Sequence, residues 1–223
     1  MKQFNRVSFI RYSRKDNMKN PDFKLAILAL ALLFMLSGCA MLGIKKDKGI
    51  LLPESTKIRN QEEQLQPGLS VIYFHGFYRN LAQMPRGKRA VEQGFPGKPI
   101  PYLDHKFGED IVFDSGRAKG VGMHIDGFIL FDKAGDYVFQ ANTNDGFRLL
   151  ISDLKIIDDP MYHSDRMSGE VKVNVSEPGW YPLRILYFQR KGTATIQLFW
   201  KKPGDKTMII VPAEAYAHIP TQN

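Results

Sequence analysis

Four oxygen-bearing side chains in the middle of the chain could hold a ligand. Asn144 and Asp145 are adjacent, and Asp158 and Asp159 follow the next hydrophobic run, directly before a proline. The alternative is conformational, because Asn-Asp-Gly is a favoured turn sequence and Gly146 can adopt the tight position. A residue before proline also avoids helical backbone. The sequence therefore predicts connections rich in oxygen atoms and leaves open whether they bind something or only turn the chain.

The loop after this acidic pair carries two aromatic side chains, Tyr162 and His163. Either could stack on a sugar ring or hydrogen-bond to its hydroxyls. The alternative is that both pack against the protein or stand free in solvent. They are candidate ligand-binding residues together with Asn144 and Asp145.

No motif for catalysis accompanies these residues. A hydrolase needs two carboxylates at a defined separation, or a nucleophile beside a base. The sequence contains no Gly-x-Ser-x-Gly, His-Glu-x-x-His or Gly-rich phosphate loop. The histidines are scattered without metal-ligand spacing: His75, His105, His124, His163 and His218. We therefore expect a protein that is not an enzyme.

A different chemistry is expected at Cys39, the only cysteine of the chain. It follows a basic stretch, the apolar run of residues 25–36 and small residues, which is the order of a secretory signal. The run is shorter than the roughly 20 residues of a membrane-spanning helix. "LSGC" at 36–39 resembles the bacterial lipobox. This resemblance implies a diacylglyceryl group on the thiol, cleavage before Cys39, and an acyl chain such as palmitate on the new amino group.

The same resemblance implies a lipoprotein of the bacterial cell envelope, with residues 1–38 as signal peptide and Met18 as an alternative start. The residue after the cysteine is Ala40 and not aspartate, which by the same resemblance favours the outer membrane. Removing residues 1–38 takes away seven basic and two acidic residues, so the formal charge falls from +8 to +3. This modest charge gives no reason to expect nucleic acid as a partner.

The remaining chain divides into a polar segment and a patterned domain. Residues 39–66 are charged with little periodicity, which favours a lipidated N-terminus and a flexible linker. Its apolar patch "GILLP" at 49–53 could instead pack on the domain or on the membrane surface. Residues 67–218 show short segments of period two between turn residues, and 219–223 form a tail. This pattern predicts one all-β domain, an antiparallel β-sandwich or partly closed barrel.

Alternation of polar and apolar residues locates the individual strands. Six are expected, at residues 123–131, 136–142, 147–152, 171–175, 181–188 and 194–200. The turn at 189–193 predicts that the last two form a hairpin, and residues 79–93 could contain a short helix. The inward-facing positions predict a core of Tyr137, Phe139, Leu149, Ile151, Leu183, Ile185, Tyr187, Leu198 and Trp200.

The order of these pieces resembles the PA14 domain, a β-sandwich module of bacterial toxins, glycosidases, proteases and fungal adhesins. Five stretches carry the resemblance: "PGLSVIYF" at 67–74, "FDKAGDYVFQANTNDGFRLLISDLKIID" at 131–158, "EPGWYPLRILYF" at 177–188, "ATIQLFWKKPG" at 194–204 and "VPAEAYAH" at 211–218. They follow the family's order over nearly all of residues 67–218.

The resemblance also implies a role for the pair at the start of this section. In sugar-binding fungal members, two aspartates at the positions of Asn144 and Asp145 hold a calcium ion across a cis peptide, and the ion binds sugar hydroxyls. Calcium takes six to eight oxygen ligands, and its affinity follows ligand charge. With Asn144 in place of the first aspartate, weak calcium binding is the most we expect, with Asp145 facing an open pocket.

Two functions are compatible with the sequence. The first is a membrane-anchored lipoprotein whose PA14-like module binds a glycan. The second is a non-catalytic structural or protein-interaction module of the envelope, because a fold does not determine a function. An exposed aromatic side chain beside Asn144 and Asp145 would favour the first, and a broad apolar patch away from them would favour the second.

Overall fold

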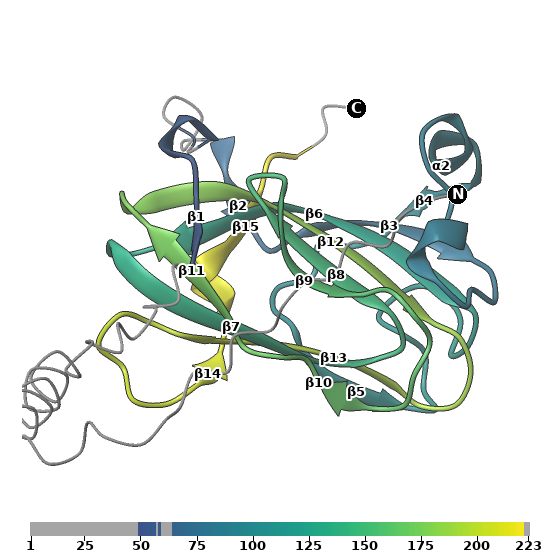
Figure 1. The fold of residues 1–223 in the computed structure, drawn as a ribbon. Coiled ribbons are helices and arrows are strands. Elements are labelled where there is room, and N and C mark those ends of the chain that lie inside the picture. Colours follow the sequence, from purple (N-terminus) through teal and green to yellow (C-terminus); the bar gives the residue numbers. More distant parts are fainter. Residues whose placement is uncertain (1–48, 57, 59–63, 221–223) are drawn as a thin grey trace, which may run out of the picture. The chain divides into compact units, whose positions relative to one another are not determined.

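Two β-sheets face each other around a hydrophobic core (Figure 1). The computed structural model describes residues 49–56, 58 and 64–220, which belong to one compact unit. The two sheets remain separate and do not close into a barrel. The predicted all-β sandwich is confirmed.

The first sheet contains seven strands of the described residues. Its path is β1 (Ile50–Leu51), β11 (Val171–Val175), β7 (Gly135–Asn144), β13 (Ala194–Lys201) and β14 (Ile209–Ile210), with β10 (Arg166–Met167) also on β7 and β5 (Asp104–Gly108) also on β13. β1 is parallel to β11, and the other pairs are antiparallel. Asn144 is the last residue of the central strand β7 and lies opposite Thr195 of β13.

The second sheet contains eight strands of the described residues, all antiparallel. Its path is β2 (Gln66–Pro67), β15 (Tyr216–His218), β6 (Val121–Phe131), β12 (Gly179–Gln189), β8 (Phe147–Ile151) and β9 (Leu154–Asp159), with β3 (Ser70–His75) on β6 and β4 (Phe95–Pro96) on β3. β6 and β12 pair along their full length of 11 residues each. This long ladder positions residues at both ends of the sheet.

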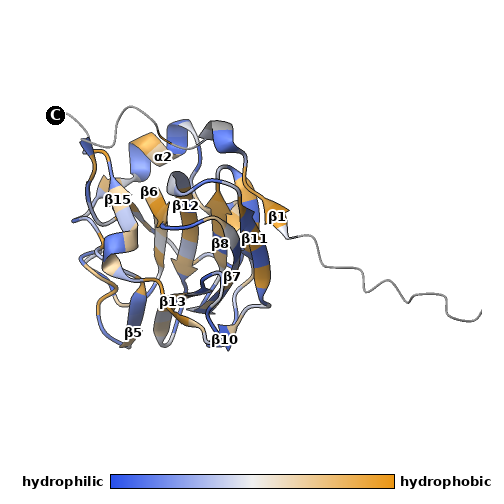
Figure 2. Ribbon diagram, turned by 90° about the vertical axis from the view of Figure 1, so that its left-hand side faces the viewer, coloured by the Kyte–Doolittle hydropathy of each residue, from blue (hydrophilic) through white to orange (hydrophobic). Residues whose placement is uncertain are grey.

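The alternating sequence pattern explains which side chains enter the core. Successive strand residues point to opposite faces, and hydrophobic and hydrophilic residues alternate along the strands in Figure 2. All nine predicted core residues are buried: Tyr137, Phe139, Leu149, Ile151, Leu183, Ile185, Tyr187, Leu198 and Trp200. The six predicted strands correspond to β6, β7, β8, β11, β12 and β13, so the assigned faces are confirmed.

The predicted hairpin at residues 189–193 is wrong. β12 belongs to the second sheet, where it pairs with β6 and β8, whereas β13 belongs to the first and pairs with β7. The connection therefore crosses from one sheet to the other. Alternation identifies the inward face of a strand but carries no information about the sheet that the strand joins, and a short turn serves either connection.

The apolar patch at 49–53 packs on the domain. β1 pairs with β11, and Leu52 is 1 % exposed, whereas the neighbouring Leu51 is 60 % exposed. The Ile58 N–H donates to the Trp180 carbonyl at the start of β12, after the 3-10 turn η1 (Glu54–Thr56). Residues 49–56 and 58 are thus part of the sandwich, and the linker prediction does not hold for them.

The predicted signal peptide, Cys39 and Ala40 lie outside the described residues. Among the residues that the structure describes, no helix is long and apolar enough to cross a bilayer.

A short helical cover lies on the outer face of the second sheet. It consists of η3 (Leu81–Gln83) and α2 (Lys88–Gln93), which confirms the short helix predicted within 79–93. A small buried cluster joins this cover to the sheet: Phe74, Tyr78, Leu81, Met84 and Phe188. A last 3-10 turn, η4 (Ala213–Ala215), leads into β15.

Candidate functional site

Three connections meet at one end of the sandwich, and we call residues 144–146, 160–165 and 189–193 the loop end. The Asp145 N–H donates to the Phe188 carbonyl over 3.1 Å, and the Phe188 N–H donates to the Gly146 carbonyl over 3.0 Å. A Cβ on Gly146 would lie 2.3 Å from Phe188 Cε1, so only glycine permits this approach. Segments far apart in sequence are thereby fixed side by side.

Asp145 ties the other two connections together. Its Oδ1 accepts the backbone N–H of His163 over 3.0 Å, and its Oδ2 accepts the backbone N–H of Arg190 over 2.7 Å. The residue is 5 % exposed, and burial raises the pKa of its carboxyl, an effect that the two N–H donors oppose. Asp145 points toward the loop after β9 as expected, but it does not face an open pocket.

Asn144 has a separate set of partners. Its Nδ2 donates to Asp165 Oδ1 over 2.8 Å and to Thr193 Oγ1 over 3.1 Å, while the Thr195 hydroxyl donates to Asp165 Oδ2 over 2.8 Å. The Tyr187 hydroxyl donates to the Asn144 carbonyl over 2.5 Å, and burial holds the pKa of this hydroxyl well above its usual range. The Asn144 amide therefore joins the end of β7 to the connection before β13 and to the loop after β9.

The Asn144–Asp145 peptide bond is cis, as the resemblance implies. The side chains, however, do not fit the calcium ion of the sugar-binding members. Calcium needs converging oxygen atoms, but both Asp145 oxygens meet N–H donors and Asn144 turns its own N–H donors toward Asp165. In the described part of the chain, no group of three or more His, Cys, Asp or Glu side chains is arranged to hold a metal. The side chains of Asn144 and Asp145 thus belong to an internal hydrogen-bond network.

The acidic pair at the end of β9 is held by basic side chains. Asp158 is paired with Arg148 over 2.8 Å and with Lys155 over 2.5 Å, and it does not join Asn144 and Asp145. Asp159 Oδ2 accepts from Arg166 Nε over 2.8 Å. These contacts orient the loop after β9.

The two aromatic candidates, Tyr162 and His163, differ in their exposure. The His163 side chain is buried, with Nδ1 2.7 Å from the Ser164 carbonyl and Nε2 3.1 Å from Asp159 Oδ2. It is a packed residue, so its predicted contact with a sugar ring does not fit this position. Tyr162 is 51 % exposed, and the Arg190 guanidinium lies over its ring at 5.6 Å from the centroid. An exposed aromatic ring thus lies directly beside the Asp145 network.

Neighbouring side chains extend this exposed surface. The Tyr162 N–H donates to the Arg79 carbonyl over 3.1 Å, and Asn80 pairs with Met161. Met161 and Phe77, on the adjoining segments, are both largely exposed. The arrangement offers apolar faces and a guanidinium on a backbone that is fixed from below, which suits a polar ligand with one apolar face.

A sequence profile of the PA14 domain matches residues 101–213, which is just over half of the chain. The chain belongs to the PA14 domain family. The PA14 profile begins after β3 and β4, which the structure nevertheless places in the same sheet as β6. No curated protein matches the sequence significantly.

Solved structures with the PA14 fold are similar but distant in sequence. An anti-sigma factor domain-containing protein from Clostridium clariflavum has 19% identity and a TM-score of 0.56, covering 71% of this chain and 49% of that one. A PA14 sugar-binding domain from an RTX adhesin has 16% identity and a TM-score of 0.52 over 68% and 98%. The Epithelial Adhesin 9 A domain from Candida glabrata, in complex with Galβ1-3GlcNAc, has 12% identity and a TM-score of 0.55 over 76% and 96%. The chain spans about half the length of the first of these, and the likeness establishes the fold alone.

Sequence reasoning located part of this PA14 loop end. Five predicted residues lie in it: Asn144, Asp145, Gly146, Tyr162 and His163. The predicted Asp158 and Asp159 lie at the end of β9, outside it. Four participants were missed: Asp165, Arg190, Thr193 and Thr195. Their roles depend on the crossing of β12 and β13 between sheets, which no local pattern reveals.

Proposed function

We propose that this protein is a membrane-anchored lipoprotein of the bacterial envelope whose PA14 domain binds carbohydrate at the loop end. The observation that carries the proposal is the exposed ring of Tyr162 beside the buried Asp145 network. A sugar ring has an apolar C–H face that packs on an aromatic ring, and the adjacent Arg190 guanidinium supplies donors for its hydroxyls. No catalytic role is proposed.

The fixed backbone of the loop end supports this role. Asp145 accepts the backbone N–H of His163, which follows Tyr162, and the backbone N–H of Arg190, whose guanidinium lies over the Tyr162 ring. The backbone beside Tyr162 and that of Arg190 are therefore positioned before a ligand arrives. A pre-formed site avoids part of the entropy cost of ordering a loop on binding. This is important for a saccharide, because its hydroxyl groups must give up bonds to water.

Two structural neighbours support the ligand class. One is described as a sugar-binding domain of an adhesin, and another was solved in complex with a disaccharide. Their distance in sequence makes carbohydrate binding a proposal for this chain. We further propose that this binding does not depend on calcium, because both Asp145 carboxylate oxygens accept hydrogen bonds within the protein and the Asn144 amide nitrogen donates to Asp165.

The binding test is a glycan array probed with calcium and again with a chelator. Wild type should bind a subset of glycans equally under both conditions, and Tyr162→Ala should lose about tenfold or more in affinity, equivalent to about 1.4 kcal/mol. Tyr102→Ala is the matched control, since Tyr102 is a partly exposed tyrosine outside the loop end. If neither wild type nor Tyr102→Ala binds any glycan, the result would favour a structural or protein-interaction role in the envelope.

The membrane anchor is proposed from Cys39. Two or more acyl chains are needed for stable anchoring, since one gives only marginal binding. Cys39→Ala should leave the protein unprocessed or released from the outer membrane, as read by fractionation and mass. A variant with unchanged mass and unchanged membrane association would contradict the lipoprotein proposal.

A further inference from the structure

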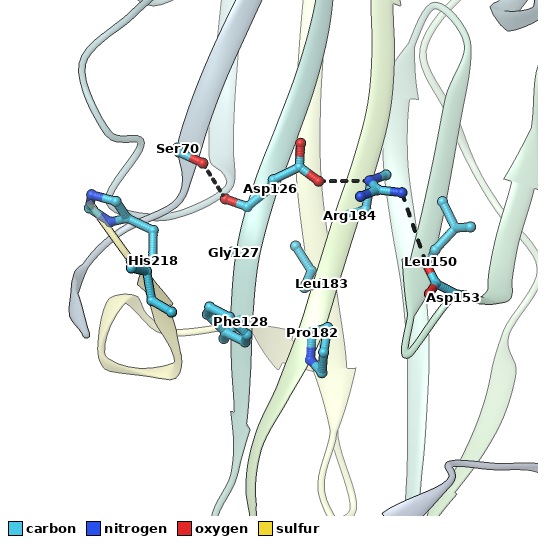
Figure 3. Close-up of a pocket in the computed structure, with 11 residues that line it drawn as sticks. Ser70, Asp126, Gly127, Phe128, Leu150, Asp153, Pro182, Leu183, Arg184 and His218 are labelled. Atoms are coloured by element: carbon cyan, nitrogen blue, oxygen red, sulfur yellow. Dashed lines mark hydrogen bonds and ion pairs between the residues drawn. The ribbon is translucent and has the colours of Figure 1, made fainter. Parts of the chain in front are cut away.

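A second concave surface lies on the outer face of the second sheet, away from the loop end (Figure 3). Its volume is about 280 Å³. The helical cover described above packs on Phe74 and Phe188 and does not line it. The lining side chains come from β3, β6, β12, β8 and β15 and from the turn after β8: Ser70, Asp126, Phe128, Leu150, Asp153, Pro182, Arg184 and His218.

Strand register sets the layout of this sheet-face pocket. Phe128 of β6 is directly opposite Pro182 of β12, and Asp126 is directly opposite Arg184. Leu150 of β8 is directly opposite Arg184 on the other side of β12. Residues two apart on a strand share a face, so an apolar pair adjoins a charged pair. Figure 3 shows Phe128 and Pro182 side by side, with Arg184 extending between Asp126 and Asp153.

Asp126, Arg184 and Asp153 form a charged row that presents both hydrogen-bond donors and acceptors. Arg184 Nε donates to Asp126 Oδ1 over 2.7 Å, and Nη1 lies 3.9 Å from Asp153 Oδ1. These side chains are all substantially exposed. One guanidinium with two carboxylates leaves an excess of negative charge, while each group keeps further bonding capacity toward a ligand.

The remaining wall is built by the C-terminal strand β15. His218 is buried, and its Nδ1 lies 3.0 Å from the Gly68 carbonyl. β15 can approach β6 because position 127 is glycine: a Cβ there would lie 2.4 Å from the Ala217 carbonyl oxygen. The wall is therefore a fixed part of the sheet.

We propose that this pocket is a second binding site, for a neutral pyranose ring of an oligosaccharide. An apolar floor of Phe128 and Pro182 fits the C–H face of the ring, and the Asp126–Arg184–Asp153 row fits hydroxyls that both donate and accept. An anionic ligand would meet two carboxylates. A purely apolar ligand would desolvate three charged groups without replacing their bonds to water, which is costly.

The sheet-face pocket is independent of the loop end. Arg184 and Arg190 are six residues apart on one strand and its extension, which corresponds to roughly 20 Å at about 3.3 Å per residue. The proposal shares only its ligand class with the proposed function. Variants at Tyr162 and variants at Arg184 therefore report on the two sites separately.

Intrinsic fluorescence of the full chain gives a direct test. The two tryptophans differ, because Trp200 is buried in the core whereas Trp180 is only partly buried, two residues from Pro182 on the same face. Cellotetraose, N-acetylchitotetraose and β-lactose are the probes, and at least one should change the Trp180 emission saturably. Arg184→Gln and Phe128→Ala should each weaken that titration by about tenfold or more, while Tyr162→Ala should leave it unchanged.

Arg148→Gln is the matched control, since Arg148 is an ion-paired arginine on the same outer face that does not line the pocket. It should titrate as wild type does, and circular dichroism should show all variants folded. The proposal is overturned if no probe changes the emission, or if the Arg184 and Phe128 variants titrate like the control. A saturable response to trilysine peptide and to none of the saccharides, strengthened in Arg184→Gln because a repelling positive charge is removed, would also overturn it, in favour of a cationic peptide.

Discussion

At the residue scale, adjacent side chains at one turn perform different tasks. Asp145 receives two backbone N–H groups and holds two loops, whereas the Asn144 amide donates to Asp165 and Thr193. A carboxylate at position 144 could accept hydrogen bonds but could not donate them. The asparagine therefore completes the network with its nitrogen, at the position where the resemblance predicted a weakened calcium ligand.

The first prediction concerns Asn144→Asp. It should place a carboxylate against Asp165 and lower the melting temperature in the presence of a chelator, since a buried hydrogen bond is replaced by like-charge repulsion. Calcium should raise the melting temperature of this variant, because the carboxylates at positions 144 and 165 would then lie together, and leave that of wild type unchanged. A calcium-induced shift in wild type would contradict the internal-network interpretation.

The second prediction concerns Asp114, whose Oδ1 accepts from the Tyr73 hydroxyl over 2.6 Å and whose Oδ2 accepts from the Lys98 N–H over 2.8 Å. Burial tends to raise the pKa of this carboxyl, but these bonds prevail and hold the pKa below the ordinary 3.8. Its stabilisation is therefore present above 3.8 and lost as the pH falls through the lowered value. The raised pKa of Asp145 acts oppositely, since its stability contribution is lost as the pH rises.

The difference in unfolding free energy between wild type and Asp114→Asn measures this effect. It should be largest near neutral pH and shrink below 3.8. Asp205→Asn, in an exposed loop, is the control and should differ little from wild type at any pH. A difference that grows with acidification would reverse the sign assigned here.

At the element scale, strands were predictable and their partners were not. Val171, Val173 and Val175 alternate with polar residues, so the inward face of β11 could be assigned from sequence. The connection of β12 to β13 resembles a hairpin turn, yet long-range pairing with β6 and β7 takes the two strands into different sheets. Arg190 reaches Asp145 only through this crossing, which is why the loop end was predicted in part.

The third prediction concerns Gly127, which lets β15 lie against β6. Gly127→Ala would place a Cβ 2.4 Å from the Ala217 carbonyl oxygen and 2.7 Å from Leu69 Cδ2. It should destabilise the domain by about 1–3 kcal/mol through overpacking. Gly169→Ala is the control, because a Cβ there meets nothing within 4 Å. Equal denaturation midpoints for the two variants would show that β15 shifts without cost.

At the scale of the whole molecule, residues 49–56 are part of the sandwich, through β1 and Leu52. A charged segment with little periodicity predicted a linker up to residue 66, but local pattern could not show that Leu52 fills a space beside β11. One buried side chain, Leu52, and the single strand pair of β1 with β11 join residues 50–52 to the domain. The rest of the predicted linker lies outside the described residues or next to β2.

The fourth prediction compares two adjacent leucines. Leu52→Ala should cost about 2–4 kcal/mol in unfolding free energy, because it leaves a cavity in the core. Leu51→Ala, at an exposed position, should stay within about 0.5 kcal/mol of wild type. If both variants match wild type in urea denaturation, residues 49–53 behave as a linker after all.

The pairing of β1 with β11 also shortens the segment between Cys39 and the sandwich. Only nine residues, 40–48, separate Cys39 from Gly49, and the ten fully extended residue steps between them span at most about 36 Å. A sandwich held by lipid on Cys39 would then search a thin shell above its own bilayer and diffuse mainly in two dimensions. Under the proposed anchoring, its ligand would have to lie within that shell or be carried into it, and glycans farther away would be out of reach however tightly they bind.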